Sequence, residues 1–165
     1  MNFDLHARTK FHLIFGVGCV AVLVFSLFHS VLTDKENLPL TITLLTAVGG
    51  VTGFLYAKHA QETQIFRELF REFNARYDTL NGRLNEIWNR PADQLLKDTD
   101  KGVLFDYFNL CAEEHMYATA GYIDSLVWRA WHNGMCHFAK DPEILDFWKR
   151  ELQQNSYYRF TLDCN

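Results

Sequence analysis

The sequence predicts an all-α protein with an N-terminal two-helix transmembrane hairpin, one long amphipathic helix and a small C-terminal helical bundle. Three observations support this prediction. Two apolar runs without charged residues occupy 11–32 and 38–57. A heptad pattern follows the second run and stops at Pro91. Beyond Pro91, apolar residues recur at helical spacing between residues that begin and end helices. Only three prolines occur in the chain, which suits long helices.

Length and composition narrow the possible classes of protein. A chain of 165 residues has room for one domain, or for a membrane hairpin plus a small domain. The net charge of −4 gives no bulk basicity of the kind that marks nucleic-acid binders. The four cysteines lie far apart, and Cys19 falls inside the first apolar run. We therefore expect no disulfide framework and a reducing cytoplasm as the setting.

The first apolar run, residues 11–32, is predicted to cross a membrane. It contains no Asp, Glu, Lys or Arg and is long enough for the hydrocarbon core of a bilayer. The preceding segment, residues 1–10, is short and polar and carries Arg8 and Lys10. We expect this segment to be a cytosolic N-terminus.

The second apolar run, residues 38–57, is predicted to return through the membrane and complete a hairpin over 11–57. A short loop with Asp34, Lys35 and Glu36 separates the two runs, and Lys58 closes the second. Positive residues therefore flank the hairpin on the side of both termini. The positive-inside rule places both termini in the cytoplasm, with two spans in a bacterial inner membrane and the lipid bilayer as a partner.

Three glycines of the second run, Gly49, Gly50 and Gly53, form a small-residue face with a GxxxG spacing. Small residues at this spacing let two helix backbones approach closely in lipid. Packing against the first span is the favoured interpretation. Contact between protomers, giving a homo-oligomer, is the alternative.

Residues 58–90 are predicted to form a long connecting helix between the hairpin and a cytosolic helical domain over 91–165. Apolar residues recur there in alternating steps of four and three, as in a coiled coil. They are Phe66, Phe70, Phe73, Tyr77, Leu80, Leu84 and Ile87. This helical seam can pair with another copy of the chain or with the chain's own C-terminal helices, and the spacing satisfies both alternatives equally.

Arg76, Arg83 and Arg90 lie in register along one flank of the seam, at heptad position g. The matching e positions carry no acidic residue, so the salt bridges of a self-pairing coiled coil are missing. The three arginines therefore predict a partner elsewhere. Candidates are an acidic face of the C-terminal domain, an acidic protein or a nucleic-acid backbone. A solvated basic face is the alternative.

The first helix of the C-terminal domain is predicted from a cap at Thr99 or Asp100 to about Thr119. Apolar side chains recur at helical spacing between these limits. Gly121 follows where a glycine commonly ends a helix in the left-handed conformation.

Two further helices follow in the domain. The first begins after a cap at Asp124 or Ser125. The second begins at Asp141-Pro142-Glu143, which combines an N-cap aspartate, a proline at the first helical position and an acid in the first turn. The C-terminal tail carries three aromatic residues that we expect to dock: Tyr157, Tyr158 and Phe160.

Two pairs of metal-ligating residues stand four apart on neighbouring helices. They are Cys111 with His115 and His132 with Cys136. Two cysteines and two histidines suit a tetrahedral zinc site if the helices form an antiparallel hairpin. The spacing matches no familiar zinc-finger signature, however, and Cys111 and His115 also follow the apolar stripe. Ordinary core positions are therefore the favoured interpretation, and no metal is expected.

Glu113 and Glu114, near His115 and His137, raise the question of acid–base chemistry or a carboxylate-bridged metal pair. Helical bundles with such metal sites use Glu-x-x-His motifs, and neither glutamate has a histidine three residues later. Exposed or capping glutamates are the favoured interpretation. The chain also lacks a Walker loop, GxSxG, HExxH and a Rossmann fingerprint. We expect neither an enzyme nor a cofactor.

Several segments of the domain carry a resemblance to known proteins. They are Tyr107-Phe108-Asn109-Leu110-Cys111-Ala112-Glu113-Glu114, Gly121-Tyr122-Ile123-Asp124, Val127-Trp128, Trp131 and Gly134-Met135. Over about Gly102 to Trp148, the chain resembles a group of small uncharacterised bacterial two-span membrane proteins with a helical C-terminal domain. That group brings no known catalytic residues. The layout is also similar to the two-transmembrane effectors of anti-phage systems, including some retrons. In those systems a partner holds a small inner-membrane protein inactive, and its release damages the membrane.

The leading functional hypothesis is a non-enzymatic inner-membrane effector in anti-phage defence. Its cytosolic domain would bind a partner and control the membrane spans, which disrupt the membrane when released. One alternative is a passive membrane anchor or scaffold that recruits a soluble protein or nucleoprotein complex. A metal-dependent helical enzyme is the third hypothesis.

Overall fold

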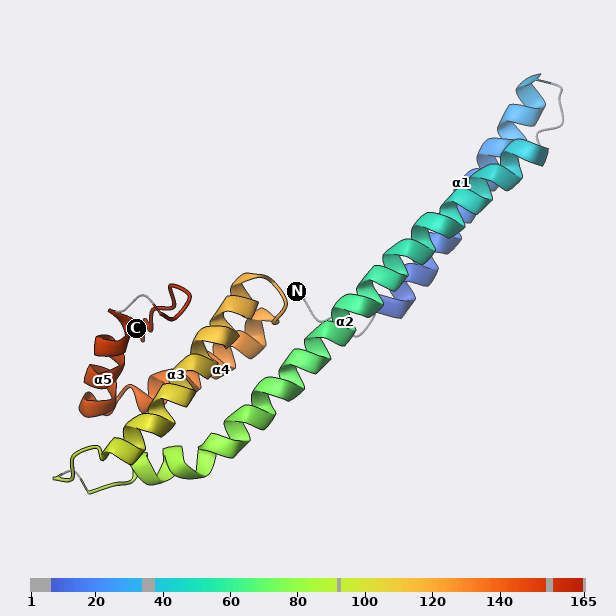
Figure 1. Ribbon diagram of the computed structural model, residues 1–165. Helices are drawn as coiled ribbons and strands as arrows, with labels where there is room; N and C mark the ends of the chain where they lie inside the picture. Colours follow the sequence, from blue (N-terminus) through green and yellow to red (C-terminus); the bar gives the residue numbers. More distant parts are fainter. Residues whose placement is uncertain (1–6, 34–37, 92, 154–155, 165) are drawn as a thin grey trace. The chain divides into compact units, whose positions relative to one another are not determined.

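The computed structural model describes residues 7–33, 38–91, 93–153 and 156–164 (Figure 1). Within these ranges the chain is helical and contains no strand, which confirms the all-α prediction. The helices are α1 (Ala7–Thr33), α2 (Leu38–Trp88), α3 (Asp98–Thr119), α4 (Ser125–Phe138) and α5 (Pro142–Leu152). The loop residues Asp34, Lys35 and Glu36 and the side chain of Arg8, on which the orientation prediction depends, lie outside the described part.

The chain divides into two compact units, Phe3–Gln64 and Ile65–Asn165, and α2 runs through the boundary without a break. We predicted a long connecting helix over 58–90, and residues 58–88 of that range belong to α2. The part of α2 from Ile65 onward packs with the C-terminal unit, called the helical domain below. The reason is that Phe66, Phe73, Leu84 and Ile87 of α2 are buried in that domain's core.

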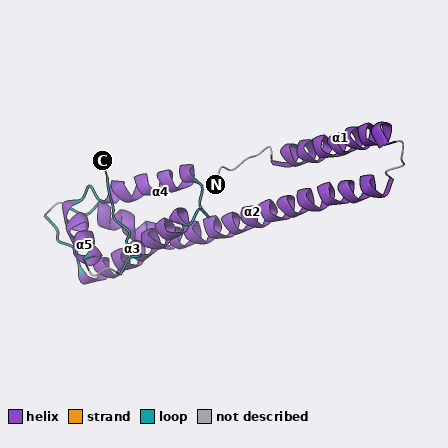
Figure 2. Ribbon diagram, turned by 90° about the horizontal axis from the view of Figure 1, so that it is seen from above, coloured by secondary structure: helices purple, strands orange, loops and turns teal. Residues whose placement is uncertain are grey.

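In the N-terminal unit, α1 lies along the first part of α2 (Figures 1 and 2). The Phe11 and Tyr56 rings meet edge to face with 5.6 Å between centroids. At the other end, the Ser26 and Thr41 hydroxyls share a hydrogen bond. These contacts at both ends show that the two helices are antiparallel neighbours.

The surface of this helix pair is apolar. Large side chains are exposed along both helices, with Val31 reaching 83% exposure. Both helices are long and apolar enough to cross a membrane, as judged by their length and composition. Soluble monomers rarely expose contiguous apolar patches of this kind, so the surface calls for an apolar environment.

The seam of α2 packs against the other helices of its own domain. Phe66, Phe73, Leu84 and Ile87 are buried in two neighbouring core clusters, and Tyr77 and Leu80 pack against both clusters. Phe70 is 40% exposed, but its ring stacks on Trp131 of α4 at 5.9 Å. The structure therefore favours the chain's own C-terminal helices over a second copy as the partner of the seam.

The ends of the domain helices follow the predicted caps. The Asp124 carboxylate accepts a hydrogen bond from the Leu126 N–H at 2.8 Å, and that of Asp141 accepts from Glu143 and Ile144. Gly121 adopts the left-handed conformation, at φ +83°. The start of α3 differs from the prediction. The helix begins at Asp98, and Asp100 in its first turn accepts from the backbone N–H of Lys97, the N-cap residue. An acid at the third helical position thus satisfies an end donor from inside the helix.

The C-terminal tail docks on the domain through two of the three aromatic residues that we predicted to dock. Tyr157 and Phe160 are buried, whereas Tyr158 is exposed. The expectation of no disulfide is wrong, because Cys136 of α4 is bonded to Cys164 of the tail, with 5.5 Å between their Cα atoms. Separation in sequence misled the prediction, since the docked tail returns Cys164 to α4.

Candidate functional site

The three predicted arginines find their partners inside the helical domain. The Arg76 guanidinium donates to both carboxylate oxygens of Glu113 on α3, at 2.5 and 3.1 Å. This hydrogen bond raises the pKa of Arg76, although burial acts in the opposite direction. Of the candidate partners, the acidic face of the chain's own domain is the one that Arg76 contacts. An acidic protein or nucleic acid would have to compete with that pair.

Arg83 of α2 also pairs with acidic side chains of the helical domain. It pairs with Glu86 on its own helix and with the Asp100 carboxylate of α3 at 3.2 Å. The Arg83 side chain is 50% exposed, although the Asp100 carboxylate is 10% exposed. Exposed ion pairs contribute little to stability, typically below about 1 kcal/mol. Arg83 is therefore useful as a comparison for the more buried arginine.

Arg90, just beyond the end of α2, is the most enclosed of the three arginines, with 11% of its side chain exposed. Its guanidinium contacts the Asp141 carboxylate at 2.7 Å and that of Glu143 at 2.9 Å. It also donates to the backbone carbonyls of Ile87 and Gln94. One side chain thus joins the end of α2, the following connector and the N-terminus of α5.

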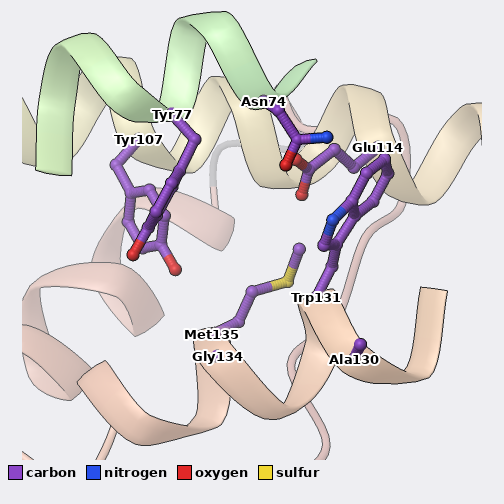
Figure 3. Close-up of a pocket in the computed structure, with 8 residues that line it drawn as sticks. All are labelled: Asn74, Tyr77, Tyr107, Glu114, Ala130, Trp131, Gly134 and Met135. Atoms are coloured by element: carbon purple, nitrogen blue, oxygen red, sulfur yellow. The ribbon is translucent and has the colours of Figure 1, made fainter. Parts of the chain in front are cut away.

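A cavity of about 220 Å³ lies between α2, α3 and α4 of the helical domain (Figure 3). Asn74 and Tyr77 come from α2, Tyr107 and Glu114 from α3, and Ala130, Trp131, Gly134 and Met135 from α4. Figure 3 shows the two tyrosines side by side at one end and Asn74 beside Glu114 and Trp131 at the other. The cavity thus combines one carboxyl group with three large aromatic side chains.

Glu114 is the chemically unusual member of this cavity. It is only 6% exposed, so the expectation of an exposed or capping glutamate is wrong for this residue. Burial raises its pKa to about 8, Arg76 opposes this rise, and the charge of Glu113 adds to it. Glu113, in contrast, lies at the surface side and holds Arg76. The signal that points to Glu114 is its spacing of seven from Tyr107 and three from Cys111, which places it on the buried face of α3.

Glu114→Gln is expected to stabilise the helical domain increasingly as pH rises. The unfolded carboxyl ionises near pH 4.5, but the folded one ionises only near pH 8. The unfolded state therefore holds fewer protons in this window, and wild-type stability falls with pH. The advantage of the variant should grow by about 1.5 kcal/mol between pH 6.5 and pH 8.

Denaturant unfolding of the full chain in detergent, followed by tryptophan fluorescence, checks this expectation. The difference between wild type and variant isolates Glu114 from His115, whose pKa is lowered by burial and by His132. Equal pH slopes for the two proteins would contradict the buried, neutral carboxyl.

The four candidate zinc ligands do not form one site. In the structure Cys136 is bonded to Cys164, and in this oxidised state it has no thiolate to offer. Cys111 is fully buried, which raises its thiol pKa well above the usual value. The His115 ring lies 5.0 Å from that of Phe160 and 5.4 Å from that of Trp128. Among the described residues, no group of three or more His, Cys, Asp or Glu side chains is placed to hold a metal.

The predicted glycine face makes few close contacts with α1. A Cβ on Gly49 would lie 4.0 Å from the Phe15 ring, and one on Gly50 or Gly53 would meet nothing within 4 Å. The close contact involves Gly18 of α1 instead, where a Cβ would lie 2.9 Å from a methyl of Val48. Sequence reasoning missed Gly18, although it lies among small residues in the first apolar run. Contact between protomers through Gly50 and Gly53 stays a prediction.

No protein-family model, curated protein or solved structure matches this chain. The resemblance to small bacterial two-span proteins therefore stays a prediction. The geometry above offers two features with functional potential. One is the Arg90 junction, which ties α2 to α5, and the other is the carboxyl-bearing cavity between α2, α3 and α4.

Proposed function

We propose that the chain is a non-enzymatic inner-membrane effector whose helical domain controls two membrane spans. In this proposal α1 and the first part of α2 cross the bilayer, and both termini lie in the cytoplasm. The apolar surface of α1 and α2 supports the membrane location, because lipid removes it from water. The excess of Lys and Arg outside the 34–36 loop supports the orientation.

The observation that carries the effector role is the continuity of α2. The helix begins in the apolar unit at Leu38 and ends at Trp88, and its second half supplies buried residues to the domain core. A partner that repacks this core therefore acts on the same helix that forms the second span. Membrane disruption during phage infection is the version that the similar layout of anti-phage effectors suggests.

Membrane potential in cells that express the full chain tests this proposal. We expect that Arg90→Ala, which loosens the junction between α2 and α5, depolarises cells more than wild type does at equal expression. Arg83→Ala is the matched control, since the half-exposed Arg83 guanidinium is screened by water and Asp100 keeps the Lys97 N–H as a donor. Adding Gly53→Leu to Arg90→Ala should abolish the extra depolarisation if protomers meet at Gly53. A side chain at this position meets nothing within 4 Å in the hairpin, so the loss would not come from a clash between α1 and α2.

Unchanged potential in all these variants, with the protein present in the membrane, would contradict the effector role. It would favour a passive anchor that recruits a soluble partner. Under that alternative, removing residues 1–57 should release the partner from the membrane without changing cell growth.

A further inference from the structure

We propose that the cavity between α2, α3 and α4 binds a small organic cation, an alkylammonium ion carried by a free solute, with the Glu114 carboxylate as its counter-ion. The proposal goes beyond the effector role and does not depend on it. Four features carry the argument: the aromatic lining, the buried carboxyl, the engagement of Arg76 by another carboxylate and the size of the cavity.

The aromatic side chains come from three different helices and line one space. Tyr77 lies on α2, Tyr107 on α3 and Trp131 on α4. The centroids of the two tyrosine rings are 6.4 Å apart and the rings are inclined by 54°, so they are not stacked flat on each other. Cations are attracted to the faces of such rings, and groups of aromatic side chains are the common recognition site for alkylated ammonium ions.

The buried carboxyl of Glu114 supplies the charge that such a ligand needs. Figure 3 shows it at the Trp131 end of the cavity, beside the Asn74 amide. The Asn74 Nδ2 donates to the Phe70 carbonyl at 2.6 Å, which leaves its Oδ1 as an acceptor. The Asn74 Oδ1 and the Glu114 carboxylate thus place two acceptors at this end, and the negative charge of the carboxylate disfavours an anionic ligand.

Arg76, whose charge lowers the pKa of Glu114, is already engaged by another carboxylate. Arg76 contacts Glu113 through two hydrogen bonds, at 2.5 and 3.1 Å, and it is not among the residues that line the cavity. Burying a carboxyl in a core is unfavourable unless a partner compensates it. A cationic ligand would provide that partner, which explains why an acid stands among core residues on α3.

The size and lining of the cavity select the class of cation. A volume of about 220 Å³ is below the range of drug-sized pockets and suits a head group such as choline. Met135, Ala130 and Gly134 complete an apolar wall that suits methyl groups. Ca²⁺ and Mg²⁺ need about six oxygen ligands, which one carboxyl and one amide do not supply.

Binding of a permanently charged ion should be linked to the protonation of Glu114. The titratable groups around it are Arg76 and Tyr77 on α2 and Tyr107, Cys111 and Glu113 on α3, and the cavity residues of α4 carry none. The pKa of Glu114 is about 8, and burial raises the pKa values of Tyr77, Tyr107 and Cys111 above their usual ones. Affinity should therefore rise about tenfold per pH unit up to pH 8 and then level off.

Calorimetric titration of the full chain in maltoside micelles with choline tests the proposal. The matched neutral ligand is 3,3-dimethylbutan-1-ol, which has carbon in place of nitrogen. We expect saturable choline binding at pH 8 that is at least about tenfold tighter than binding of the neutral alcohol. Glu114→Gln should reduce this preference strongly, whereas Asp106→Asn, which removes an exposed carboxylate of α3 outside the cavity lining, should keep it.

The outcomes are separable from a folding defect, because Glu114→Gln is expected to stabilise the domain at pH 8. Equal affinity for choline and the alcohol, an unchanged preference in Glu114→Gln, or no saturable binding of choline would each overturn the proposal.

Repeating the titration in lipid discs distinguishes the source of the ion. Weaker choline binding in choline-headgroup discs than in glycerol-headgroup discs would assign the cavity to a lipid head group and overturn the free solute. The membrane-potential results for Arg90→Ala are independent of all these outcomes.

Discussion

Arg90→Ala is expected to lower the free energy of unfolding of the helical domain by about 3 to 5 kcal/mol, the range for breaking a buried ion pair from one side. The substitution leaves the Asp141 and Glu143 carboxylates without their cation, and it removes the donors to the Ile87 and Gln94 carbonyls. Asp141 is also the N-cap of α5. The burial of that carboxyl tends to raise its pKa, but the hydrogen bond and charge of Arg90, together with the backbone N–H groups of Ile144 and Glu143, outweigh burial and lower the pKa.

Tryptophan fluorescence during denaturant unfolding of the full chain in detergent measures this loss. All four tryptophans of the chain lie between residues 88 and 148, so the signal reports the helical domain alone. Arg83→Ala serves as the control, and its effect should stay below about 1 kcal/mol. Similar losses for Arg83→Ala and Arg90→Ala would argue against the special role of the enclosed guanidinium.

A second-site test separates the unpaired charge from lost packing. Adding Asp141→Asn and Glu143→Gln to Arg90→Met neutralises the two acids and keeps an amide at the cap of α5. The triple variant should recover part of the stability lost in Arg90→Ala, because uncompensated buried charge is the larger penalty. No recovery would assign the loss to the packing of the arginine side chain instead.

Cys164→Ser is expected to destabilise the oxidised helical domain by about 3 to 4 kcal/mol, the entropic effect of opening a loop of this length. The bond joins residues 28 apart, and the tail that it tethers buries Tyr157 and Phe160. In the unfolded chain the same bond restricts the tail, so its removal favours unfolding. Unfolding of wild type and variant, with and without reductant, measures the difference.

The reductant provides the internal control for this prediction. Wild type under reducing conditions should match Cys164→Ser, and the variant should not respond to the reductant. Cys19→Ser, which removes a free thiol of α1, should behave like wild type in both conditions. A wild type that is equally stable with and without reductant would contradict a stabilising bond.

The redox state of Cys136 and Cys164 in cells also reports the orientation of the protein. With both termini in the cytoplasm, as we propose, the cellular thiol systems should keep this pair largely reduced. Alkylation of intact cells, followed by non-reducing electrophoresis, measures the fraction that is bonded. Complete oxidation would place the domain on the oxidising side and overturn the orientation, while the two apolar helices would keep their membrane role.

The sequence by itself determined the elements of this protein and most of their ends. Periodicity identified the helices, and the local chemistry of Asp124, Asp141 and Gly121 predicted their limits. The apolar runs predicted α1 and the first part of α2, and the tail aromatics predicted docking. These features depend on residues within a turn or two of each other. Local spacing and capping are therefore sufficient to predict them.

Only the tertiary structure decided what each helix face meets. Spacing showed that α2 has an apolar seam with an arginine flank. Only the folded structure shows that the seam and the arginines contact α3, α4 and α5. The same packing buried Glu114, brought Cys164 to Cys136 and made Gly18 the close contact of α1. A helix face is a local property of the chain. The opposing surface comes from segments distant in sequence, and only their packing determines which side chains meet, which charges pair and which carboxyl loses water.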